Sequence, residues 1–144
     1  MPANNRTRKS RKLAKSSHNS VEQLIVVQFL EMMHTIKLFH WKTTSYPTHK
    51  ATDDLHGKIS GSIDTFVETM LGKHGGRVNL TGVKTIALND YSSMDSFKSE
   101  IAKYKTFLKD LNNMLNPVND SDLLNIRDEI LGDLNQFTYL LTFH

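Results

Sequence analysis

Apolar residues in this chain recur every three or four positions, which is the spacing of one face of an α-helix. The first such segment begins at Ser20, where Gln23 completes a capping-box pattern, and it runs to about residue 43. The positions that define its apolar face are Val26, Phe29, Met33, Ile36 and, at the end, His40. We therefore predict a first helix over residues 20–43.

Three further helices are predicted from the same periodicity and from residues that typically begin or end a helix. Pro47 suits the first turn of the second helix, and Gly75 with Gly76 suits its end. A break at Pro117 separates the third helix from the fourth. The predicted spans are residues 48–73, 93–116 and 119–143.

Four helices of this length predict an all-α fold, a four-helix bundle over residues 20–144. The first and third connections are short, so the helices that they join should be antiparallel. The middle connection, residues 75–92, is long enough to travel the length of a bundle. One long crossover between the second and third helices is the ferritin-like arrangement, and we expect that topology here.

Charge divides the chain into two parts. All of the 15 acidic residues lie after residue 19, together with only twelve of the 18 lysines and arginines, so the body has a net charge of −3. Residues 1–19 have no acidic residue and little apolar periodicity, and we expect a disordered arm that binds DNA without sequence preference or serves localisation. Its six cations are Arg6, Arg8, Lys9, Arg11, Lys12 and Lys15.

Composition excludes several classes of protein. There is no cysteine, so disulfide scaffolds, thiolate zinc sites and cysteine nucleophiles are excluded. No apolar run exceeds four residues, so we expect no membrane partner. The expected location is the cytoplasm or the nucleoid, or the virion if a virus encodes the chain.

The second helix carries four residues that could bind a metal. His49, Asp53, Asp64 and Glu68 fall within about 100° of one another around the helix axis, beside its apolar face. Taken singly, His40 could be a core histidine, and Asp53 or Glu68 a solvated charge. Together in one stripe, these side chains favour a metal site.

Distance along the helix decides how such a site is built. At about 1.5 Å per residue, His49 and Glu68 are roughly 28 Å apart, so they cannot bind one ion within one chain. His40 lies just before the first turn and joins His49 and Asp53 in a first half-set, while Asp64 and Glu68 form a second half-set. An antiparallel two-fold dimer would bring the first half-set of one chain against the second half-set of its mate, twice.

These residues resemble the ferroxidase motif of the Dps family, the miniferritins. The matching features are His40-Trp41, the His-x3-Asp of residues 49–53 and the Asp-x3-Glu of residues 64–68. The spacing from His40 to His49 is three residues shorter than usual, which places a deletion in the loop. Residues 40–51 and 64–72 also resemble an uncharacterised ferritin-like family encoded by large DNA viruses.

The Dps resemblance implies a shell of twelve subunits that oxidises Fe(II) with peroxide or oxygen and stores the ferric product. It implies that His40, His49 and Asp53 come from one subunit, and Asp64 and Glu68 from its mate. Iron suits imidazole with carboxylate, and zinc could use the same ligands. Trp41 and His56 are expected beside these ligands, Trp41 with packing as its default role, and the basic arm resembles the DNA-binding arms of some members.

Two other functions remain open from the sequence. The chain could be a structural, DNA-compacting or virion-associated protein whose metal site is vestigial, or a dimer stabilised by zinc. Iron oxidation separates these possibilities, because a structural protein would bind DNA and leave Fe(II) unchanged.

Overall fold

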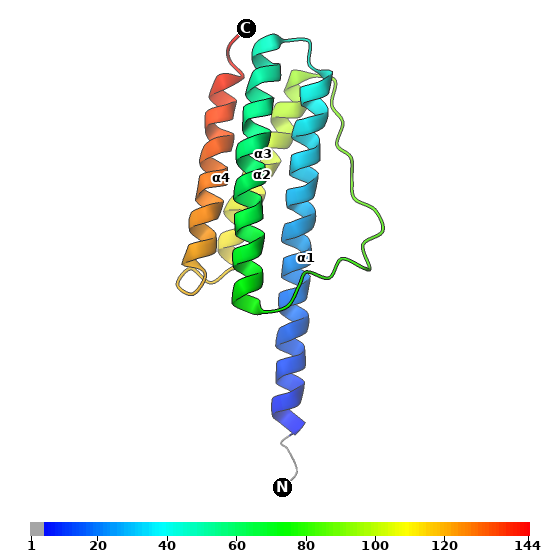
Figure 1. The fold of residues 1–144 in the computed structure, drawn as a ribbon, viewed down its shortest axis with the longest axis vertical. Coiled ribbons are helices and arrows are strands. Elements are labelled where there is room, and N and C mark those ends of the chain that lie inside the picture. Colours follow the sequence, from blue (N-terminus) through cyan, green and yellow to red (C-terminus); the bar gives the residue numbers. More distant parts are fainter. Residues whose placement is uncertain (1–4) are drawn as a thin grey trace.

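The computed structural model describes the backbone of residues 5–144 and the side chains of residues 19–144. Its helices are α1 (Asn5–Lys42), α2 (Tyr46–His74), α3 (Met94–Met114) and α4 (Ser121–Leu140), and this described part of the chain has no strand. Figure 1 shows the four helices side by side in one bundle. The predicted all-α four-helix bundle is confirmed.

The first helix begins earlier than predicted. Its start is Asn5 and not Ser20, so the predicted boundary is wrong, and the disordered arm is not supported for residues 5–19. A helix that is already nucleated continues easily through lysine, arginine and alanine, which have high helix propensity. Gln23 does not cap a helix, and its Nε2 instead donates a hydrogen bond to Asn79 O (2.5 Å). The early part of α1 extends beyond the end of the bundle (Figure 1).

Local signals fix both ends of α2. Ser45 is its N-cap, and the Ser45 side chain accepts a hydrogen bond from Thr48 N, with Pro47 in the first turn. At the other end Gly75 has a φ of 75°, and its N–H donates to Leu71 O. Glycine is favoured there because a side chain would be strained at positive φ. The four predicted metal-binding residues of this segment therefore all lie on one uninterrupted helix.

The core-facing side of α1 is shifted by one position from the predicted one. Phe29 and Ile36 are buried as predicted, whereas Val26 and Met33 are only half-buried and pack at the edge of the core. The buried apolar positions of α1 are Ile25, Phe29, Met32, Ile36 and Phe39, and its buried polar positions are Glu22, Thr35 and His40. Val26 and Met33 are therefore left on the outer surface between α1 and α2. None of the helices in the described residues is both long and apolar enough to cross a membrane.

The connection between α2 and α3, residues 75–93, follows α1 from one end of the bundle to the other (Figure 1). Its contacts advance along α1 in the same order as along the connection. They are the hydrogen bonds from Gln23 Nε2 to Asn79 O (2.5 Å), from Ala87 N to Glu31 Oε1 (3.2 Å) and from Lys42 Nζ to Asp90 Oδ2 (2.6 Å). As a result α3 starts at the end of the bundle where α2 starts, and the two helices run in the same direction.

A buried carboxylate secures the end of this connection. Glu100 of α3 is only 8% exposed, and its carboxylate accepts hydrogen bonds from Tyr91 OH (2.9 Å) and Asn89 Nδ2 (3.4 Å). The same Asn89 amide donates to Tyr104 OH (3.3 Å), which is 2.7 Å from Thr35 Oγ1 on α1. These bonds satisfy polar groups that would be costly to bury alone. They tie the connection to both α1 and α3.

This network predicts an alkaline loss of stability. The hydrogen bond to Glu100, followed by burial, raises the pKa of Tyr91 to about 12. Because the folded pKa is raised, the stabilisation is complete below the unfolded pKa of about 10 and is lost as the pH rises from about 10 to about 12. We expect the tyrosinate absorbance difference between wild type and Tyr91→Phe to appear with a midpoint near 12. A midpoint near 10 would contradict the hydrogen bond to Glu100.

Candidate metal centre

Four of the predicted ligands, all on α2, are exposed, whereas His40 on α1 is buried with 8% of its surface exposed. His40 is in the last turn of α1 and His49 is in the first turn of α2, joined by the short turn of residues 43–45. Asp53 follows one turn after His49. The structure thus brings the first half-set together, whereas Asp64 and Glu68 lie further along α2.

The two histidines form a crossed pair. His40 Nδ1 is 2.9 Å from His49 O, and His49 Nδ1 is 3.1 Å from His40 O. Their rings are stacked, with centroids 4.0 Å apart and planes 21° apart. The carbonyl of His40 is available because the last carbonyls of a helix have no partner within it. The end of α1 therefore creates an acceptor that orients a ring on α2.

This pairing determines which ring nitrogens carry protons. A carbonyl oxygen only accepts hydrogen bonds, so the Nδ1 atoms of His40 and His49 must both be protonated. In the neutral imidazole, Nε2 then holds the lone pair that a metal ion needs. Each histidine of the first half-set is consequently oriented as a nitrogen donor.

Asp53 lies between the ammonium group of Lys37 and the imidazole of His40. Its Oδ1 is 4.0 Å from His40 Nε2 and 4.0 Å from Lys37 Nζ. The Asp53 side chain is 56% exposed, so one face of the carboxylate remains open to solvent. Among the described side chains, no group of three or more His, Cys, Asp or Glu is arranged to hold a metal ion within one chain.

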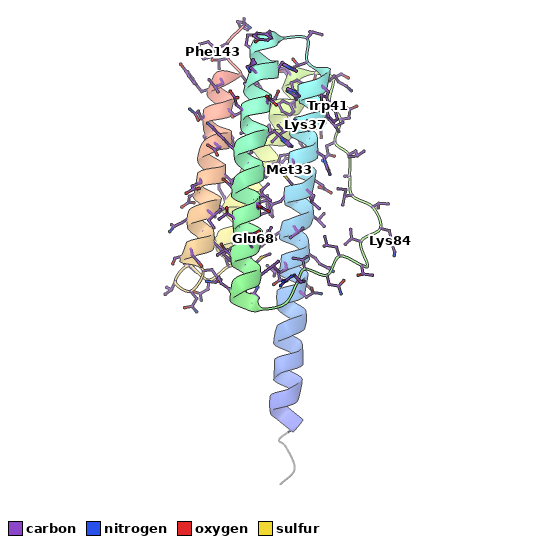
Figure 2. All side chains as sticks on the ribbon, viewed as in Figure 1. Met33, Lys37, Trp41, Glu68, Lys84 and Phe143 are labelled. Carbon is purple, nitrogen blue, oxygen red and sulfur yellow. The ribbon has the colours of Figure 1, made fainter. Side chains whose placement is uncertain are left out.

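The second half-set is on the surface beside an apolar groove. Asp64 and Glu68 are both exposed. Asp64 lines a groove of about 490 Å³ between α1 and α2, whose walls include Val26, Met33 and Val67. Figure 2 shows Glu68 on the lower part of α2, whereas Lys37 and Trp41 lie on the upper part of α1. Both carboxylates are therefore open to a second molecule.

His56 and Trp41 flank the first half-set in different ways. Burial lowers the pKa of His56, the Lys37 ammonium lowers it further, and the Asp53 carboxylate raises it. His56 is thus within electrostatic reach of these two residues. Trp41 is 70% exposed, so the default expectation of a packing role is wrong within this chain.

The remaining predicted site residues are the six cations of the N-terminal arm, whose side chains lie outside the described residues. Sequence reasoning missed two residues that contact the first half-set. Thr52 contacts the His40 ring and Lys37 contacts Asp53. Lys37 stands three positions before His40, a spacing that places two residues on one helix face.

Comparison with known protein families places most of the chain in one family model. Residues 40–141 match the model of a family of unknown function, DUF5856. The matched span includes all five predicted ligands, from His40 to Glu68. No curated protein and no solved structure matches the chain. Since the match covers more than half of the sequence, the chain belongs to the DUF5856 family.

Proposed function

We propose that this protein is a ferritin-like, Dps-like iron protein that oxidises Fe(II) at sites shared between two copies and stores or detoxifies the product. The observation that carries the proposal is the arrangement of two incomplete ligand sets on one α1–α2 face. The first, His40, His49 and Asp53, is assembled at one end of the face. The second, Asp64 and Glu68, is exposed towards the other end.

A two-fold axis through this face would complete both sets. It would place the two carboxylates of one copy opposite the two imidazoles of the other. It would also place acidic side chains near Lys37, and bring the half-buried apolar residues around the groove together. Burying that apolar surface favours association. The finer architecture proposed is a closed shell of such dimers, with twelve subunits as in the Dps family.

The ligand chemistry suits iron as the substrate. Two imidazole Nε2 atoms and three carboxylates are donors that bind Fe(II), and carboxylate oxygens also hold the ferric product. Oxidation transfers one electron from each Fe(II) to peroxide or oxygen. The exposed oxygens of Asp53, Asp64 and Glu68 supply the negative charge that offsets the additional positive charge on iron.

Iron titration tests the proposal. Fe(II) is added to the purified oligomer with peroxide or oxygen as the oxidant, and ferric absorbance is followed. We expect many Fe(II) ions oxidised per oligomer, and a rate close to that of protein-free buffer for the Asp64→Ala/Glu68→Ala variant. The matched control is Asp54→Ala, a neighbouring exposed carboxylate outside both half-sets, which should oxidise iron at the wild-type rate.

Three outcomes would overturn the proposal. If the wild-type protein does not oxidise Fe(II) faster than buffer alone but does shift the electrophoretic mobility of DNA, a structural, DNA-compacting or virion-associated protein is favoured. Zinc binding that stabilises a dimer without iron oxidation would favour a structural metal site. A monomer near 16 kDa at physiological salt would remove the shared site altogether.

A further inference from the structure

Thr52 is a buried residue at the centre of the first half-set, and sequence reasoning gave it no role. It is 0% exposed, and its hydroxyl lies 3.1 Å from His40 Nδ1. The same hydroxyl donates a hydrogen bond to Thr48 O (2.8 Å) and is also 3.0 Å from His49 O. It therefore joins the two histidines from inside the protein.

The direction of these hydrogen bonds follows from their partners. The hydroxyl has one proton, which is directed at carbonyl oxygens of its own helix, so a lone pair remains for His40. His40 Nδ1 consequently faces two acceptors, the Thr52 hydroxyl and the carbonyl of His49. Such an environment holds the Nδ1 proton in place and disfavours the other tautomer, because a deprotonated Nδ1 would direct its lone pair at the lone pairs of the His49 carbonyl and the Thr52 hydroxyl.

We infer that Thr52 is a positioning residue, which locks His40 as the Nδ1–H tautomer and keeps His40 Nε2 available as a metal donor. The inference rests on the proposed metal site. Groups that orient a ligating histidine through its second nitrogen affect metal affinity strongly, typically by 10–100-fold when they are lost. Burial makes the effect larger here, because no water replaces the hydroxyl.

The variant that tests this role is Thr52→Val, which keeps the shape and removes the hydroxyl. We expect zinc, used as a redox-inactive probe, to bind about ten-fold more weakly. Trp41 is the chain's one tryptophan and follows His40 directly, so its fluorescence can report binding. Thr52→Ser should restore wild-type affinity, because it restores the hydroxyl.

A matched control separates positioning from stability. Thr35 is also a buried threonine whose hydroxyl donates to the carbonyl four residues earlier, Glu31 O, but its side-chain partner is the hydroxyl of Tyr104 and not a predicted metal ligand. Thr35→Val should lower the stability of the fold and leave zinc affinity unchanged. Equal losses of affinity in Thr35→Val and Thr52→Val would overturn the positioning role.

A second measurement does not need a metal. Nitrogen chemical shifts of the imidazoles in the metal-free protein report the tautomer, and His40→Gln identifies the His40 signal. We expect the Nδ1–H form for His40 in wild type, and a larger population of the Nε2–H form in Thr52→Val, because that variant loses one of the two acceptors of the Nδ1 proton and keeps only the carbonyl of His49. An unchanged tautomer in the variant would overturn the inference. A wild type that binds no zinc or iron would overturn the proposed function instead, and the tautomer would still decide the role of Thr52.

Discussion

Two variants that each fail to bind iron are expected to recover binding when they are assembled together. The first carries His40→Ala and His49→Ala, and the second carries Asp64→Ala and Glu68→Ala. Each alone lacks every site, because each proposed site takes one half-set from each chain. In a mixed dimer, an intact His40/His49/Asp53 set faces an intact Asp64/Glu68 set at one of the two sites. At the other site both half-sets are defective.

The amount recovered is itself a prediction. With random pairing about half of the dimers are mixed, so about a quarter of the wild-type sites should return. Iron binding is measured on oligomers unfolded together, refolded and checked for size. The control mixes wild type with the doubly deficient chain that carries all four substitutions, which should also yield about a quarter of the sites. No recovery in a correctly assembled mixture would refute the shared site.

The helix rise is what makes this test decisive. Asp53 and Asp64 both lie within the uninterrupted helix α2 (Tyr46–His74). Eleven residues of helix separate them by roughly 16 Å along the axis. Metal–oxygen bonds are about 2 Å long, so the two half-sets of one chain cannot share an ion.

The fold was largely predictable because periodicity and end signals agree. The helix α3 starts where expected, with Ser93 as its N-cap and the Ser93 side chain accepting a hydrogen bond from Ser96 N, and the start of α4 lies within two residues of its prediction. The start of α1 was not predictable from these signals. Ser20 and Gln23 have the pattern of a capping box, but the helix runs through both residues. The pattern alone does not indicate whether the residues before it are also helical.

The candidate site was predictable in its residue types and only partly in its contacts. The i to i+4 spacing of His49 and Asp53 sets their common face. The crossed hydrogen bonds between His40 and His49 depend on a free carbonyl at the end of α1 and on a three-residue turn. Thr52 gave no sequence signal, because a threonine beside an aspartate is common and its role depends on tertiary packing.

Removing residues 1–17 is expected to abolish salt-sensitive DNA binding while leaving the bundle folded. These residues carry six cations and no acid, and the body that remains has a net charge of −3. Up to six phosphate contacts per arm imply that log affinity falls with log salt with a slope of magnitude about 5. Fluorescence anisotropy of a labelled duplex at several salt concentrations measures both the affinity and the slope.

A second variant separates charge from helix length. Changing the six cations to glutamine keeps the residues of α1 that begin at Asn5, and it should lose DNA binding as completely as the truncation. Iron oxidation should be unchanged in both variants, because His40 and its partners lie at the opposite end of α1. A truncated protein that keeps wild-type affinity and salt dependence for DNA would show that the arm serves another purpose. A glutamine variant that still binds would show that helix shape, rather than charge, makes the contact.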